Sequence, residues 1–126
     1  MKRTISTDAA PAAVGAYSQA TATDDLLFTA GQLPLTPDGE LLDDESVATQ
    51  TEQCLENVAA ILDSEGLDLS DVLKVTIFLD DIDDFDEMNE TYGKFFDDEP
   101  PARSAIEVGN VPKGAALEIE AVAAIE

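Results

Sequence analysis

The chain has 126 residues, with 28 acidic side chains, 6 basic ones, no histidine and a formal net charge of −22. Six dispersed cations cannot form the basic stripe that neutralises nucleic-acid phosphates or an anionic membrane, so binding to either is not expected. Histidine is the commonest general base and transition-metal ligand, and its absence excludes zinc-dependent hydrolysis and Ser-His or Cys-His catalysis.

Hydrophobic residues make up 44% of the chain and occur in periodic segments, which predicts one folded domain over residues 1–126. The single cysteine, Cys54, allows no intrachain disulfide, and there is no apolar leader and no apolar run of membrane length. We therefore expect a cytoplasmic protein. The acidic residues are spread evenly, which is typical of halophilic proteins; an acidic protein that binds a basic partner is the alternative.

The first third of the chain predicts strands. Short strands are expected around Ile5 and over residues 16–22, and a buried strand over residues 26–30, which ends at Gly31. The segment Pro37-Asp38-Gly39 predicts a turn, because proline presets φ and glycine accepts a positive φ.

A helix is predicted over residues 45–65, where apolar side chains recur every three or four positions. Asp43 or Asp44 is expected to cap its start and Gly66 to follow its end. Cys54 lies on its apolar stripe, without a cationic neighbour in the sequence, and is therefore interpreted as a core residue.

The second half predicts a strand, a helix and two more strands. Residues 72–80 alternate, with Leu73, Val75, Ile77 and Leu79 expected on the buried face. A second helix is expected over about residues 83–96, with Phe85, Met88, Tyr92 and Phe95 on its inner stripe. Strands follow over residues 102–108 and 116–125.

The predicted order is β-β-β-α-β-α-β-β, an α+β domain with a mixed sheet and both helices on one face. Two helices cover only one face of such a sheet. The other face would show Phe78, Ala116, Val122 and Ala124 among its polar residues. Because a half-apolar open face usually meets a partner, we expect a homo-oligomer whose sheets face a common centre.

Arg103 is the leading candidate for a functional residue. It is one of two arginines, and its planar donors suit a carboxylate better than lysine does. On composition alone, a structural ion pair with one of the acidic groups is the simpler interpretation.

Strand alternation places Arg103, Ala105 and Glu107 on one face of their strand, and Glu118 and Glu120 on one face of the last strand. The two strands are therefore predicted to present Arg103 and Glu118 to one cleft, suited to a small carboxylate ligand and a water molecule. A solvated face of glutamates is the alternative.

Three further candidates have plain structural alternatives. Gly31 marks a bulge, a close backbone approach to a ligand or a simple strand end. Tyr17 either binds a ligand or covers the surface. Asn89 is expected at the edge of the inner stripe of the second helix, and an asparagine on a helix surface is usually unremarkable.

Several segments together resemble the Rid family, also called the YjgF type, over about residues 5–125. They are Ala10-Pro11-Ala12-Ala13-Val14-Gly15-Ala16-Tyr17-Ser18-Gln19, Thr29-Ala30-Gly31-Gln32-Leu33-Pro34, Asn57-Val58, Phe85-Asp86-Glu87-Met88-Asn89-Glu90-Thr91-Tyr92, Pro101-Ala102-Arg103-Ser104 and Glu118-Ile119-Glu120-Ala121. The Pro-Ala-Arg-Ser segment followed at this spacing by Glu-Ile-Glu-Ala is the most specific pair.

The resemblance implies a chorismate-mutase-like fold and a cytoplasmic homotrimer with sites between subunits. It implies an enzyme that needs no metal or organic cofactor and hydrolyses 2-enamino and 2-imino acids, such as 2-aminoacrylate, to 2-keto acids and ammonia. Arg103 would hold the substrate carboxylate and Glu118 would position water, while Tyr17, Gly31 and Asn89 match pocket positions.

One position departs from the family pattern, because Ala105 stands where a cysteine is typical. Its backbone can still contribute to substrate binding, whereas regulation through a thiol at that position is not expected. The competing interpretations are a trimer that binds 2-keto acids without catalysis, a ribonuclease or translation inhibitor, which the charge opposes, and a structural or chaperone-like role.

Overall fold

The computed structural model describes residues 1–126, the whole chain, and contains the predicted order of strands and helices. The elements are β1 (Arg3–Ile5), β2 (Ala20–Ala22), β3 (Leu26–Thr29), α1 (Val47–Asp63), β4 (Val72–Leu79), α2 (Phe85–Gly93), β5 (Ala102–Glu107) and β6 (Leu117–Ala124). Neither helix is long and apolar enough to cross a membrane.

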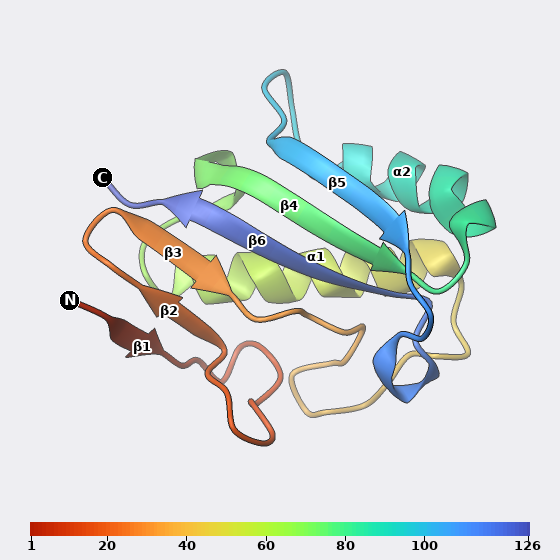
Figure 1. The fold of residues 1–126 in the computed structure, drawn as a ribbon, viewed down its shortest axis with the longest axis horizontal. Helices are drawn as coiled ribbons and strands as arrows, with labels where there is room; N and C mark the ends of the chain where they lie inside the picture. The colour runs from red at the N-terminus through yellow and green to blue at the C-terminus, as the bar shows by residue number, and fades with distance from the viewer.

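The six strands form one sheet in the order β1-β2-β3-β6-β4-β5. Only β4 and β5 pair in parallel; the other neighbours are antiparallel. Both helices lie on the same face of the sheet, α1 behind its centre and α2 behind the β5 edge (Figure 1). The predicted α+β class, mixed sheet and one-sided helices are therefore confirmed.

The core lies between this sheet face and the helices. In β6 alternate residues are buried, namely Leu117, Ile119, Ala121 and Ala123. They meet the buried stripe of α1, which includes Leu55, Val58, Ile61 and Leu62 and confirms the helical spacing. Cys54 belongs to this core, as predicted, and burial raises the pKa of its thiol well above the ordinary value.

The start of α1 differs from the prediction. Ser46 caps the helix, because its side chain accepts a hydrogen bond from the Thr49 N–H, so the prediction of Asp43 or Asp44 is wrong. The end agrees with the prediction. Gly66 has a φ of 75° and donates to the Asp63 carbonyl, while the Leu67 N–H bonds the Leu62 carbonyl, which is the Schellman pattern.

A β-bulge changes the predicted facing of β4. The register shifts between Val72 and Lys74, so Val72 is buried and Leu73 is 51% exposed. The prediction that Leu73 lies on the buried face is therefore wrong, because an extra residue reverses the alternation at that point. Val75, Ile77 and Leu79 are buried as expected.

Most predicted elements are one or two residues too long at an end, and two are too long by three or four. The strand predicted from residue 16 begins only at Ala20, because Gln19 holds a loop together by bonding the Thr7 backbone N–H (2.6 Å) and carbonyl (3.0 Å). The helix predicted over residues 83–96 is α2, which a 3₁₀ turn precedes (Ile82–Asp84) and which ends at Gly93.

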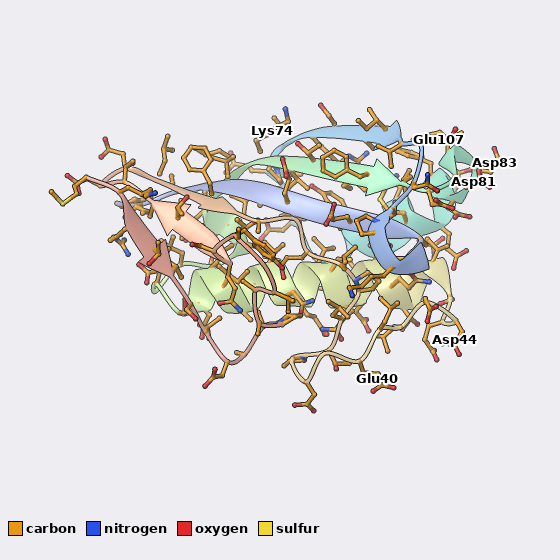
Figure 2. The ribbon with its side chains drawn as sticks, turned by 60° about the horizontal axis from the view of Figure 1, so that its bottom comes forward. Glu40, Asp44, Lys74, Asp81, Asp83 and Glu107 are labelled. Atoms are coloured by element: carbon orange, nitrogen blue, oxygen red, sulfur yellow. The ribbon has the colours of Figure 1, made fainter.

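The sheet face opposite the helices is partly apolar, as predicted. Phe28 is 44% exposed and Ile106 47% exposed, and Phe78 and Val122 are half-buried on the same face. Lys74 lies on this open face as well, opposite Val122, and its side chain points away from α1 (Figure 2).

Candidate active site

Arg103 lies on the edge strand β5, on the helix face of the sheet. It pairs with Val75 of β4, whose side chain is buried under the helices. One terminal nitrogen, Nη1, donates a 2.7 Å hydrogen bond to Oδ1 of Asn89. The guanidinium carbon lies 4.7 Å from the ring centre of Tyr92 and 5.4 Å from that of Phe85. All three contacting side chains come from α2.

Arg103 has no carboxylate partner in its own chain. The one ion pair of the structure joins Arg3 to Glu65. The interpretation of Arg103 as a structural ion pair, which composition favoured, is therefore wrong. Around it lies a cleft of about 470 Å³, which Tyr92, Phe96 and Pro101 also line. A guanidinium that is oriented by an amide and open to a cleft is suited to bind a small carboxylate.

Glu118 lies in a second cleft of about 410 Å³, which Tyr17, Gly31, Leu33 and Pro112 also line. It pairs with Phe78 of β4 on the open face of the sheet. A Cβ atom on Gly31 would stand 2.7 Å from Cδ of Glu118, a separation that atoms do not adopt. The strand does end just before Gly31, at Thr29, but Gly31 is also a position of close approach, between its backbone and the Glu118 carboxyl group. A close approach to a ligand at Gly31 stays a prediction.

The carboxyl group of Glu118 is in an unfavourable place for a negative charge. Burial raises the pKa of Glu118 above the ordinary value of glutamate, and the charge of Glu120 on the same strand face raises it further. Such a carboxyl group exchanges protons at a higher pH than a solvated glutamate and can accept a proton from a bound water molecule.

Backbone pairing and one buried asparagine side chain hold the walls of the Glu118 cleft. Gln32 exchanges two backbone hydrogen bonds with Ile119, at 2.7 and 3.0 Å. The side chain of Asn57, 1% exposed, donates to the carbonyls of Leu33 (3.2 Å) and Leu35 (2.9 Å). These contacts fix the segment that carries Gly31 beside β6.

Arg103 and Glu118 do not share a cleft within one chain. They lie on opposite faces of the sheet, and β4 separates their strands. The prediction from alternation is therefore wrong for a single copy. Alternation correctly grouped Arg103 with Ala105 and Glu107, but it does not say which face of β5 meets the helices, and here it is the face that carries the arginine.

The other predicted site residues divide between the two clefts. Asn89 joins Arg103, so it is more than an ordinary surface asparagine, whereas Tyr17 and Gly31 join Glu118. Ala105 pairs with Ile77 on the helix face, packs against the core and lines neither cleft.

Sequence reasoning missed the rings of Phe85 and Tyr92 as part of the site, since both lie on a stripe interpreted as core. Their spacing of seven residues, with Asn89 between them, is the signal that could have found them. Burial raises the pKa of Tyr92, although the charge of Arg103 opposes that shift, so the phenol beside the guanidinium stays neutral.

The whole chain is similar to known proteins. A family model described as endoribonuclease L-PSP matches residues 7–125. The 2-iminobutanoate/2-iminopropanoate deaminase of Escherichia coli K12 is 43% identical over 127 residues, which cover 98% of either chain. The crystal structure of yeast YEO7 has a TM-score of 0.96 at 39% identity and covers 100% of both chains.

A second solved structure contains a small molecule. E. coli TdcF with bound serine has a TM-score of 0.93 at 40% identity and covers 98% of this chain and 99% of its own. The family match, the identities and the shared chorismate-mutase-like α+β fold together show that this chain belongs to the Rid family of proteins.

Proposed function

We propose that this protein hydrolyses reactive 2-imino and 2-enamino acids, such as 2-aminoacrylate, to 2-keto acids and ammonia. The observation that carries the proposal is the guanidinium of Arg103, which Asn89 orients and which no carboxylate neutralises in a chain with 28 acidic residues. The 43% identical E. coli deaminase and the serine bound to TdcF support a small amino-acid-like ligand.

The active site would be completed by two copies of the chain. The Arg103 cleft lies at the β5 edge and the Glu118 cleft on the open face, so one chain cannot bring both groups to one ligand. The open face, with Phe28, Leu73 and Ile106 exposed, is the surface that association would bury. We propose a homotrimer in which Arg103 of one copy faces Glu118 of the next.

The reaction then needs a positioned substrate, which Arg103 would provide, and proton transfer, which Glu118 would provide. Arg103 binds the substrate carboxylate through two parallel hydrogen bonds and fixes the imine carbon in place. An enamine first takes up a proton from solvent at its terminal carbon, which gives the protonated imine. Glu118 accepts a proton from water as the water oxygen bonds to the imine carbon, and it then returns this proton to the nitrogen of the adduct. The C–N bond breaks as the C=O bond forms, and the hydroxyl proton joins the departing ammonia, so the products are the 2-keto acid and ammonium. General-base catalysis of this kind contributes about 10²- to 10⁴-fold.

The function is tested by generating the unstable substrate enzymatically in the assay mixture. A serine dehydratase generates 2-aminoacrylate at high salt, and 2-keto acid formation is followed with and without the protein. We expect the protein to accelerate formation. An unchanged rate would leave a 2-keto acid binding protein without catalysis as the better interpretation, and RNA cleavage that depends on Arg103 would favour the ribonuclease.

Replacing Gly31 by alanine should displace the catalytic carboxylate. The added Cβ would meet Cδ of Glu118 at 2.7 Å, and this flexible side chain can move where the backbone cannot. We expect kcat to fall about tenfold or more, because misplacement of a catalytic group is costly. Circular dichroism should show an unchanged fold. An alanine variant with wild-type kcat would show that the carboxylate position does not matter.

The pH dependence of the reaction should reflect Glu118. A carboxyl group that acts as a base works only when ionised, so the rate should rise with pH through a pKa above that of ordinary glutamate. Glu120→Gln removes a neighbouring charge and should move this rise to lower pH. The pH profile of kcat/KM for both proteins measures the shift, and identical profiles would contradict the assignment.

A further inference from the structure

We propose that the aromatic rings of Phe85 and Tyr92 are positioning residues that hold Arg103 ready to bind a carboxylate before the ligand arrives. The proposal deepens the proposed function, since it concerns the arginine of the same site. In this proposal, residues of α2 fix the side chain of Arg103, which lies on β5.

The three contacts of Arg103 come from consecutive turns of α2. Phe85, Asn89 and Tyr92 are spaced by four and three residues, so they lie on one face of the helix. The guanidinium carbon is over both rings, at 5.4 and 4.7 Å, and Nη1 bonds Asn89 at 2.7 Å. A free arginine side chain moves among many rotamers, so contacts made before binding reduce the entropic cost of ordering it.

The rings also suit the ligand chemistry. Aromatic faces attract the cation and shield part of it from water, but they accept none of the in-plane hydrogen bonds that a carboxylate uses. Only Asn89 takes a guanidinium hydrogen within the chain, which leaves the other N–H groups for the ligand. The rings therefore hold the charge without competing for it, as an acidic partner would.

The ring of Tyr92, rather than its hydroxyl group, carries this role. The side chain is 5% exposed, and its hydroxyl oxygen is the one buried side-chain polar atom of the chain without a hydrogen-bond partner. An unpaired buried hydroxyl destabilises a protein, so Tyr92→Phe should preserve the ring contact and leave the fold at least as stable.

The experiment compares Phe85→Leu, Tyr92→Leu and Tyr92→Phe, with Phe95→Leu as the matched control. Phe95 follows the same helix and packs against the core, but it does not line the Arg103 cleft. The readouts at fixed salt are Kd for pyruvate by calorimetry, kcat and KM for 2-aminoacrylate hydrolysis, and the melting temperature.

We expect Tyr92→Leu and Phe85→Leu to raise Kd and KM about tenfold while kcat changes little, because the rings support binding of the carboxylate throughout the reaction. Tyr92→Phe should bind like the wild type. Phe95→Leu should melt at a lower temperature but keep the wild-type Kd.

Three results would overturn the proposal: unchanged Kd in both leucine variants, an equal loss in Tyr92→Phe, or an equal rise in Kd for Phe95→Leu. A wild-type protein that binds no pyruvate would also contradict it. Pyruvate binding that weakens in the two leucine variants of a protein without hydrolytic activity would support the positioning role and reject only the deaminase.

Discussion

Two inactive variants should restore activity to each other when they are assembled together. Arg103→Ala removes the proposed carboxylate-binding group and Glu118→Gln removes the proposed base, so each variant alone should lose hydrolysis of 2-aminoacrylate almost completely. In a mixed trimer, Arg103 of a Glu118→Gln copy can face Glu118 of an Arg103→Ala copy. Random mixing of equal amounts makes about a quarter of the interfaces complete in this way.

The measurement is the hydrolysis rate after the two variants are unfolded, mixed and refolded together, compared with the same proteins refolded separately and then combined. We expect about a quarter of the wild-type rate in the first sample. Oligomer mass in the same buffer shows that trimers have formed. No recovery in mixed trimers would mean that each site is built within one chain, against the separation of Arg103 and Glu118 by the sheet.

Salt should strengthen substrate binding, although it weakens most contacts between an arginine and a carboxylate. Three copies would carry three times the net charge of −22, and the proposed substrate is itself an anion, so the protein should repel it at a distance. Raising the salt concentration from about 0.1 to 1 M shortens the Debye length from about 10 to 3 Å. Arg103 acts within contact distance, so the long-range repulsion is reduced more than the local attraction.

We expect KM to fall about tenfold over this range while kcat stays nearly constant. The matched control neutralises an exposed acidic segment whose first residue, Asp97, lines the Arg103 cleft, with Asp97→Asn, Asp98→Asn and Glu99→Gln combined. This variant should show a smaller change with salt. Trimer mass is followed in every buffer so that assembly is not mistaken for binding. A KM that rises with salt would show that the local ion pair dominates.

Much of the fold could be predicted because it depends on spacing within a segment. The stripe of α1, the alternation of β6 and the role of Gly66 each need only neighbouring residues. The errors occur where one extra residue changes the spacing, or where a contact between residues distant in the sequence determines the local structure. The bulge at Leu73 reverses the facing of β4, and the side chain of Gln19 holds the loop before β2 together by binding Thr7.

The sequence pointed to Arg103 and Glu118 as candidate residues, but it pointed neither to the rings of Phe85 and Tyr92 nor to the arrangement of the two clefts. Arg103 is conspicuous in a chain with few cations, and Glu118 follows from the family resemblance. Their separation depends on the strand order, which places β4 between β5 and β6, and no local pattern in the sequence contains that order. The contact of Gly31 with Glu118 also joins distant parts of the chain, so it could be proposed as a close approach but not assigned a partner.

The two clefts differ in the sequence separation of the residues that build them. Asn89 and Arg103 are separated by 14 positions, whereas the backbone pairing that builds the Glu118 cleft joins Gln32 to Ile119, across most of the chain. Closing the longer loop costs about 1.6 kcal/mol more in chain entropy. During folding the Arg103 cleft can therefore form early from α2 and β5, and the Glu118 cleft is completed only when β6 enters the centre of the sheet.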